Sequence, residues 1–253
     1  MRYQISSLFY ILLFLFLSLV PRGINAEEPS NEAKRITSII DKVIDAYGGK
    51  DVIGGIQSVS AKGKIEAFML KDQGTYEYYF KRGRKLRVET KYGHSSEVRI
   101  LNGDKGYRGT DTLPFKEVSG ARYLSIVYQY KHLNILHDLI TGAYQISSGG
   151  KAAVSDYVEV FRLVDREGAV MDVFVDTRTA YIIKVTAYFA ADNKQTELSA
   201  EFSDFKKVGN SVFPFRITNY AGGLKVAQTV IEKYSLNPDI ADSMFAPTRI
   251  QSF

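Results

Sequence analysis

The sequence predicts a mainly β protein, built on a single curved antiparallel sheet with two or more helices. Many short segments alternate apolar and polar residues and end at Gly, Asn or Asp turn signals, which is the pattern of antiparallel strands. Only two stretches show the 3–4 spacing of an amphipathic helix. The 253 residues include 17 Tyr and 15 Phe but no Trp, and rings at this density suit wide apolar sheet faces.

The first 26 residues have the pattern of a secretory signal peptide. Arg2 begins a short basic region, the apolar run Leu8–Val20 follows, and Pro21 ends that run shortly before Ala26. A transmembrane helix needs about 20 apolar residues, so an uncleaved anchor is the less favoured alternative. We therefore expect cleavage after Ala26 and a single domain over residues 27–253, since no linker, composition shift or repeat divides that stretch.

Cysteine content and net charge restrict the cellular compartments and the classes of partner that are compatible with the sequence. The chain has no cysteine, so it has neither a disulfide nor the cysteine that carries a lipid anchor, which suits a Gram-negative periplasm. Removing residues 1–26 takes Arg2 and Arg22 from the 33 basic residues and nothing from the 28 acidic ones, leaving a net charge of +3. This mild, dispersed excess indicates a mixed-charge surface and no nucleic-acid partner.

The first half of the expected mature chain reads as one helix followed by a meander of strands. Apolar residues recur at helical spacing over Asn31–Tyr47, and Gly48 and Gly49 then stop the helix. Tight turns follow, among them Asn102-Gly103, whose residues tolerate positive φ. The strands that these turns separate are predicted at Val59–Leu70, Thr75–Lys81, Lys85–Thr90, Glu97–Leu101 and Gly106–Gly109.

The second half begins with a loop and a helix before strands return. Residues 110–120 contain Pro114 and Gly120 and are expected to form a loop, whereas Ala121–Ile140 carries apolar residues at helical spacing. The total is ten or eleven strands. The later strands are predicted at 157–163, Ala169–Asp176, Tyr181–Phe189, Thr196–Phe205, Ser211–Tyr220 and Leu224–Tyr234.

The sequence contains no group of reactive side chains whose spacing would bring them together in a catalytic or metal site. Two of the three histidines, His132 and His137, lie five residues apart on the second predicted helix, about 140° around its axis, so they cannot chelate one ion from one face. Three carboxylates on neighbouring predicted strands could form an acid–base pair, but turn capping and surface roles explain them better. They are Glu159, Asp172 and Asp176. We predict no catalytic residues, no metal, no cofactor and no enzymatic activity.

Apolar side chains on single strand faces are the candidate binding residues. Most such residues form ordinary core, but a curved sheet with few helices can leave part of its concave face uncovered as an apolar cleft. The apolar periodicity of the strands is compatible both with an ordinary core and with a ligand-binding cleft. The residues predicted to line a cleft are Tyr78, Phe80, Leu86, Val88, Ile100, Phe174, Phe202, Phe215 and Ile217.

Three segments resemble the LolA-like family, the periplasmic carriers of outer-membrane lipoproteins. FVDTRTAYIIKV, which begins at Phe174, is similar to a strand–turn–strand segment of that family. FKKVGNSVFPFRIT, from Phe205, resembles a hairpin with a Gly and a Pro, and NPDIADSMF, from Asn237, resembles the closing segment. These stretches are turns and strand ends, so they bear on the fold more than on the cargo, and they contain no cargo-contact signature.

The resemblance implies a LolA/LolB-like incomplete β-barrel of eleven strands, plugged by helices, with a cavity for acyl chains. It implies a soluble periplasmic carrier or chaperone that binds lipid or an acylated lipoprotein and delivers it to the outer membrane. A partner protein in the inner or outer membrane is part of this expectation. The alternative is an envelope sensor or interaction module that uses the same cleft to regulate a membrane partner.

Overall fold

The computed structural model describes residues 30–151, 155–191 and 194–247. The signal peptide predicted for residues 1–26 lies outside these ranges. Within them, no helix combines the length and the apolar character that crossing a bilayer requires. The helices of the described chain are α1 (Asn31–Ala46), α2 (Gly49–Gly55), α3 (Gly120–Ile140) and a short 3-10 helix η1 (Asp242–Phe245).

Two strand meanders flank α3 in the chain and join in space into one antiparallel sheet. The first meander comprises β1 (Ser58–Ala67), β2 (Asp72–Lys81), β3 (Lys85–Tyr92), β4 (Ser96–Asn102), β5 (Lys105–Gly109) and β6 (Lys116–Val118). The second comprises β7 (Tyr144–Lys151), β8 (Val158–Asp165), β9 (Val170–Asp176), β10 (Tyr181–Ala191), β11 (Lys194–Val208), β12 (Ser211–Ala221) and β13 (Leu224–Leu236). Pairing of β1 with β13 joins them, which leaves β6 and β7 as the two edges of a 13-stranded sheet.

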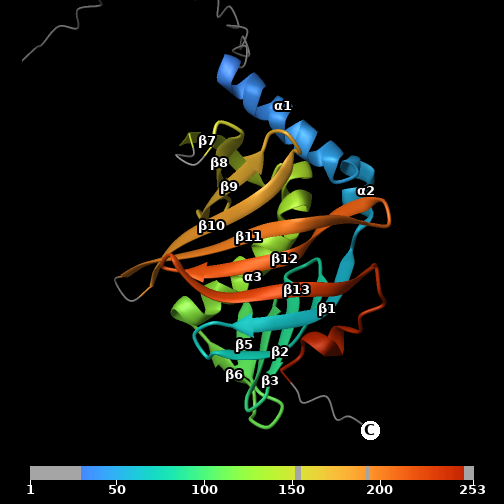
Figure 1. Cartoon of the computed structure of the whole chain (residues 1–253), viewed down its shortest axis with the longest axis vertical. Coiled ribbons are helices and arrows are strands. Elements are labelled where there is room, and N and C mark those ends of the chain that lie inside the picture. The colour runs from blue at the N-terminus through green and yellow to red at the C-terminus, as the bar shows by residue number, and fades with distance from the viewer. Residues whose placement is uncertain (1–29, 152–154, 192–193, 248–253) are drawn as a thin grey trace, which may run out of the picture.

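Helix α3 explains why this sheet curves. Thirteen strands spaced about 4.8 Å apart would place the edges of a flat sheet about 58 Å apart. A helix of 21 residues spans only about 31 Å, yet α3 leads from edge strand β6 to edge strand β7 through short connections. The edges must therefore curl towards each other, and α3 lies in the hollow behind the central strands (Figure 1).

Ion pairs hold the curled ends of the sheet together. Arg84, in the turn between β2 and β3, places Nη1 3.2 Å from Glu167 Oε1 in the turn between β8 and β9. Lys131 of α3 donates to the Asp165 carboxylate and lies 3.5 Å from Glu167 Oε2. The two turns and the helix therefore meet at one point, although the edge strands β6 and β7 do not pair with each other.

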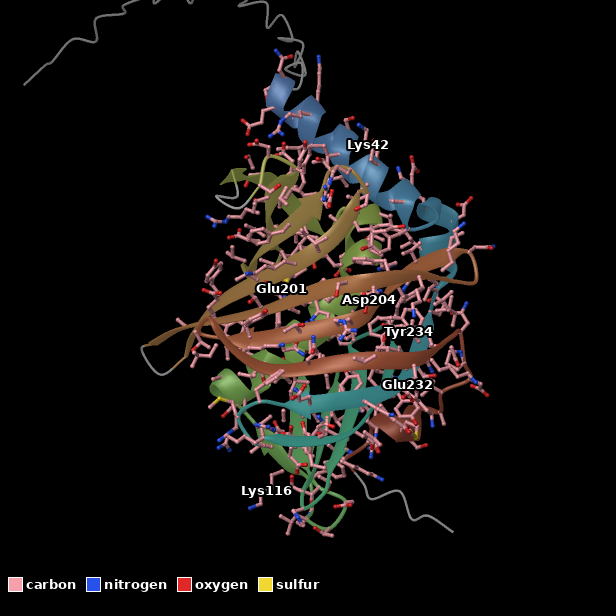
Figure 2. All side chains as sticks on the ribbon, viewed as in Figure 1. Lys42, Lys116, Glu201, Asp204, Glu232 and Tyr234 are labelled. Carbon is pink, nitrogen blue, oxygen red and sulfur yellow. The ribbon has the colours of Figure 1, made fainter. Side chains whose placement is uncertain are left out.

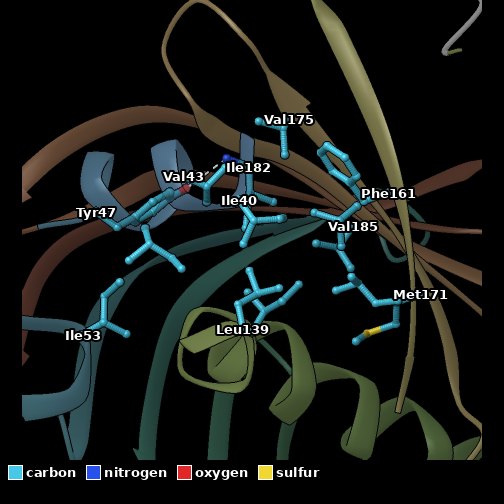
Figure 3. Packing of buried hydrophobic residues seen from close by; sticks show 14 of the residues in the cluster. Ile40, Val43, Tyr47, Ile53, Leu139, Phe161, Met171, Val175, Ile182 and Val185 are labelled. Carbon is cyan, nitrogen blue, oxygen red and sulfur yellow. Dashed lines mark hydrogen bonds between the residues drawn. The ribbon is translucent and has the colours of Figure 1, made fainter. Parts of the chain in front are cut away.

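Helix α1 packs its apolar stripe against one part of the concave face. The buried residues of this stripe are Ile36, Ile40, Val43 and Ile44. Tyr47 follows the helix and anchors it, since its hydroxyl accepts a hydrogen bond of 3.2 Å from the Ile182 N–H and its carbonyl accepts one of 2.8 Å from Ser211 Oγ (Figure 3). These two bonds fix the position of the α1–α2 corner over β10 and β12.

Both faces of the sheet carry apolar clusters, but they differ in extent. On the concave face, two large clusters surround α3. On the opposite face, a smaller cluster of Val98, Ile100, Ile240 and Phe245 lies where the C-terminal segment with η1 covers β3 and β4. Elsewhere this opposite face carries charged side chains such as Glu201, Asp204 and Glu232 (Figure 2).

The predicted fold class is confirmed: the protein is mainly β, with one curved antiparallel sheet that does not close. The strand count differs, since the described chain has 13 strands and the sequence predicted ten or eleven. The additional strands are the two edges, β6 within the expected loop 110–120 and β7 in an unassigned stretch. Helix α2 is also additional, because Gly48 ends α1 with a φ of 108° but a second short helix starts directly after it.

Candidate ligand-binding site

An apolar pocket lies between α3 and the concave face of the sheet. Side chains alternate along each strand, so Tyr78 and Phe80 of β2, Phe202 of β11 and Ile217 of β12 all point to this side. The cavity has a volume of about 90 Å³. Its other lining residues are Tyr47, Val59, His132, Leu133, Ile135, Leu136, Ile182, Val212, Phe213, Pro214 and Tyr234.

Aromatic contacts stiffen the wall of this pocket. Tyr234 is in contact with three rings, with centroid distances of 6.4 Å to Tyr78, 4.9 Å to Phe213 and 5.2 Å to Phe215. The Tyr234 hydroxyl donates to the Pro214 carbonyl at 2.6 Å. Because each ring braces its neighbours, the pocket walls are preorganised for an apolar ligand and little side-chain ordering is needed on binding.

His132 is the polar exception in this apolar lining. Its ring lies 5.4 Å from Tyr128 and 5.8 Å from Phe202. Its buried Nδ1 has no hydrogen-bond partner among the described residues. Burial lowers the pKa of His132 to about 4, so the imidazole is neutral at neutral pH and adds no charge to the pocket.

Comparison with known proteins identifies the architecture around this pocket. No protein-family model matches the sequence, and no curated protein matches it. Three solved structures do resemble the fold. A DUF1329 family protein from Desulfovibrio piger has a TM-score of 0.54 at 11% identity, over 83% of this chain and 97% of that one. A LolA superfamily protein from Nitrosomonas europaea has a TM-score of 0.51 at 13% identity, over 83% and 96%.

The third is a putative outer membrane lipoprotein-sorting protein domain from Vibrio parahaemolyticus, with a TM-score of 0.52 at 9% identity over 82% of this chain and 94% of that one. The chain has a LolA-like fold. The resemblance seen in the three sequence segments is thereby confirmed at the level of the fold, which is all that identities of this size show. None of the three neighbours carries the name of an enzyme.

Within the LolA-like fold, the nine predicted cleft residues separate into distinct groups. Four of them line the apolar pocket: Tyr78, Phe80, Phe202 and Ile217. Leu86 and Val88 belong to the same concave cluster but are 0% and 1% exposed and do not line the pocket. Phe215 packs beside Tyr234 with Lys206 Nζ 4.6 Å from its ring centre, and it is likewise outside the lining.

Two of the nine predictions need correction, because the side chains face the other side of the sheet. Ile100 packs in the opposite-face cluster with Ile240 and Phe245. Phe174 lies on the outer side of β9, with Lys184 Nζ 5.5 Å from its ring centre. In both strands the two faces carry apolar residues, so alternation alone does not reveal which face is concave.

Sequence reasoning missed the contribution of α3 and of the α1–α2 corner to the pocket. Leu133 and Leu136 of α3 and Tyr47 line it, but these residues were assigned only to helix packing. The available signal was that apolar residues of α3 are not confined to one stripe, since Ile126, Val127 and Tyr128 follow one another, which is typical of a helix with neighbours on several sides.

The carboxylates considered for acid–base chemistry are each paired with an arginine. Asp172 accepts two hydrogen bonds from Arg162, at 2.8 and 2.9 Å. Glu159 accepts from Arg35 at 2.7 Å, and Asp176 accepts from Arg178 in its own turn. In the part of the chain that the structure describes, no group of three His, Cys, Asp or Glu side chains could hold a metal ion.

Proposed function

We propose that this protein is a non-enzymatic carrier that binds the acyl chain of a lipid or lipoprotein in the pocket beside α3. The pocket is the observation that carries the proposal, because its lining is almost entirely aliphatic and aromatic. Each methylene that leaves water contributes about 0.8 kcal/mol. A chain of about a dozen carbons therefore gains several kcal/mol after ordering costs are subtracted.

The proposed place of work is the periplasm. The signal-peptide pattern of residues 1–26 and the absence of cysteine support this location. So does the likeness of the fold to a LolA superfamily protein and to a lipoprotein-sorting domain. A carrier in the periplasm releases its cargo to the outer membrane or to a protein in that membrane. We propose such a membrane protein as the partner.

Filling the pocket tests the proposal without introducing a charge. Leu133→Trp adds an indole to a half-buried position that lines the pocket, so it should exclude part of an acyl chain. Losing burial of only two methylenes weakens binding by about tenfold. Delipidated protein is titrated with a fluorescent fatty acid, and circular dichroism checks the fold of each variant.

Leu124→Trp is the matched control, because Leu124 lies on the same helix but lines a different hollow beside the β8–β9 turn. Its affinity should stay within about twofold of wild type. Equal affinity for Leu133→Trp and wild type would place the ligand elsewhere. Absence of saturable binding by delipidated wild type would remove the carrier proposal altogether.

A further inference from the structure

A second pocket lies directly beside the apolar one on the concave face. Apolar side chains such as Ile65, Leu198 and Val226 line part of it, but it carries more polar groups than the first and is named the polar pocket. His132 borders both pockets. On β2, Tyr76 lines the polar pocket and Tyr78 lines the apolar one. On β12, Asn219 lines the polar pocket and Ile217 lines the apolar one. The polar pocket is the larger of the two, with a volume of about 310 Å³. The two pockets thus lie end to end.

Arg99 supplies positive charge to this second pocket. It pairs with Val88 of β3, an inward-facing position, so its side chain also points to the concave side. The Arg99 Nε atom is buried and has no hydrogen-bond partner among the described residues. The carboxylate in ion-pair range is that of Glu97, whose Oε2 lies 3.7 Å from this nitrogen, beyond hydrogen-bond distance.

Glu97 does not neutralise Arg99, because it is already shared. Its other oxygen accepts a hydrogen bond from Arg108, the cross-strand neighbour of Arg99 on β5. Two guanidinium groups therefore share one carboxylate, and Arg122 adds further positive charge near Arg108. Burial also lowers the pKa of Arg99, as expected for a desolvated cation that would gain from an anion.

Helix α3 adds a polar stripe that faces the same pocket. Ser125, Gln129 and His132 occupy positions i, i+4 and i+7 and all line it. Gln129 Nε2 donates to the Tyr76 hydroxyl at 3.2 Å, whereas Gln129 Oε1 is buried without a partner among the described residues, as is His132 Nδ1. Buried polar atoms in native structures are nearly always paired, so these three unpaired atoms mark places around one hollow where a polar ligand group or a bound water would pair.

We infer that the two pockets together bind a single-chain amphiphile with an anionic headgroup, with the chain in the apolar pocket and a carboxylate or phosphate at Arg99. This inference rests on the proposed carrier function and narrows its ligand class. Arg99 offers the planar, charged donor that binds such oxyanions well. The Tyr76 hydroxyl, which accepts from Gln129 Nε2, offers its own O–H as a neutral donor on the facing side of the hollow.

The test compares three ligands with the same twelve-carbon chain: dodecanoate, dodecyl phosphate and dodecanol. Delipidated wild type should bind the two anions about tenfold more tightly than dodecanol, since a charge-assisted pair adds to the same chain burial. The stronger of the two anions identifies the headgroup as carboxylate or phosphate. Dodecanol binding as tightly as both anions would overturn the inference while leaving the carrier function in place.

Two substitutions should shift anion binding in opposite directions. Arg99→Gln removes the cation and should weaken binding of the anions by about tenfold, with dodecanol within about twofold of wild type. Glu97→Gln removes the competing carboxylate and should tighten anion binding by a few-fold. Arg216→Gln, which breaks an ion pair with Asp204 on the outer face, is the control and should change neither.

Equal weakening of all three ligands by Arg99→Gln would show a structural role for Arg99 and contradict the inference. If Arg99→Gln fails to fold, the salt dependence of ligand binding by the wild-type protein tests the inference instead. Dodecanoate binding should weaken as salt rises from 0.05 to about 0.5 M while dodecanol binding does not, because added ions screen only the charged contact. Identical salt responses of the two ligands would overturn the inference, and failure of all three to bind would remove the proposed function with it.

Discussion

Tyr47 shows how one residue links the helical corner to the sheet. Its hydroxyl accepts from the Ile182 N–H at 3.2 Å (Figure 3), and its ring meets that of Tyr181 edge-on at a centroid distance of 5.6 Å. Tyr47→Phe keeps the ring but leaves a buried N–H unpaired, which should lower the free energy of unfolding by about 1–2 kcal/mol. Urea denaturation measures this difference.

Tyr181→Phe is the matched control, because it removes a hydroxyl from the other ring of the same pair. It should change the unfolding free energy by less than about 0.5 kcal/mol. Equal losses for the two variants would mean that ring packing, and not the hydrogen bond to Ile182, anchors the corner.

Alternation along a strand shows which side chains share a face where the other face is polar, and it is ambiguous where both faces are apolar. Tyr78 and Phe80 alternate with polar neighbours and lie on the concave face, where both line the pocket. Leu86 and Val88 also lie on the concave face but do not line the pocket. Ile100 lies in a strand where Val98, Ile100 and Leu101 are all buried, because the C-terminal segment covers the outer face there. Nothing in the alternation of β4 could reveal that second cover, which comes from more than 130 residues later in the chain.

At the scale of single elements, α1 is the helix whose burial the sequence predicts most clearly. Ile40 is 9% exposed within its apolar stripe, while Ser38 is exposed on the other side. Ile40→Asp should lower the unfolding free energy by several kcal/mol because it buries an unpaired charge. Ser38→Asp should be nearly neutral. Thermal unfolding followed by circular dichroism compares the variants, and coincident midpoints would contradict this account of the buried face.

Edge elements were harder to predict than central ones for physical reasons. β6 has three residues, and β7 contains Ser147-Ser148-Gly149-Gly150, which carries little apolar alternation. Edge strands are commonly short and polar, since this limits pairing with other chains. The central helices and strands were predicted well, because burial on the concave face imposes a regular apolar period on them.

At the scale of the whole molecule, ion pairs join the two halves of the curled sheet where α3 and the β2–β3 and β8–β9 turns meet. Lys131 and Asp165 are 10% and 13% exposed in their side chains, so the pair is buried. Burial acts to raise the pKa of Asp165, but hydrogen bonds from Lys131 and the Ala169 and Glu167 amides hold it below 3.8. A depressed carboxyl pKa stabilises the fold above about pH 4, and this contribution is lost as the pH falls through the folded-state pKa.

Asp165→Asn should therefore destabilise the protein by about 3 kcal/mol at pH 7, because it leaves Lys131 buried without its partner. The difference between variant and wild type should be smaller at pH 3 than at pH 7, because below the unfolded-state pKa of about 3.9 the unfolded chain takes up the proton before the folded one. Urea denaturation at both pH values measures the two differences. An equal difference at pH 7 and pH 3 would show that the Lys131–Asp165 charge pair does not hold the curled ends together.

The central claim is that an acyl chain occupies the pocket between α3 and the sheet. Nuclear Overhauser contacts between isotope-labelled dodecanoate and the delipidated protein test it most directly. The chain methylenes should show contacts to Phe80, Phe202, Leu133 and Ile217, which surround the pocket. Contacts confined to exposed apolar residues such as Leu113 and Leu224, or no contacts at saturating ligand, would contradict the account.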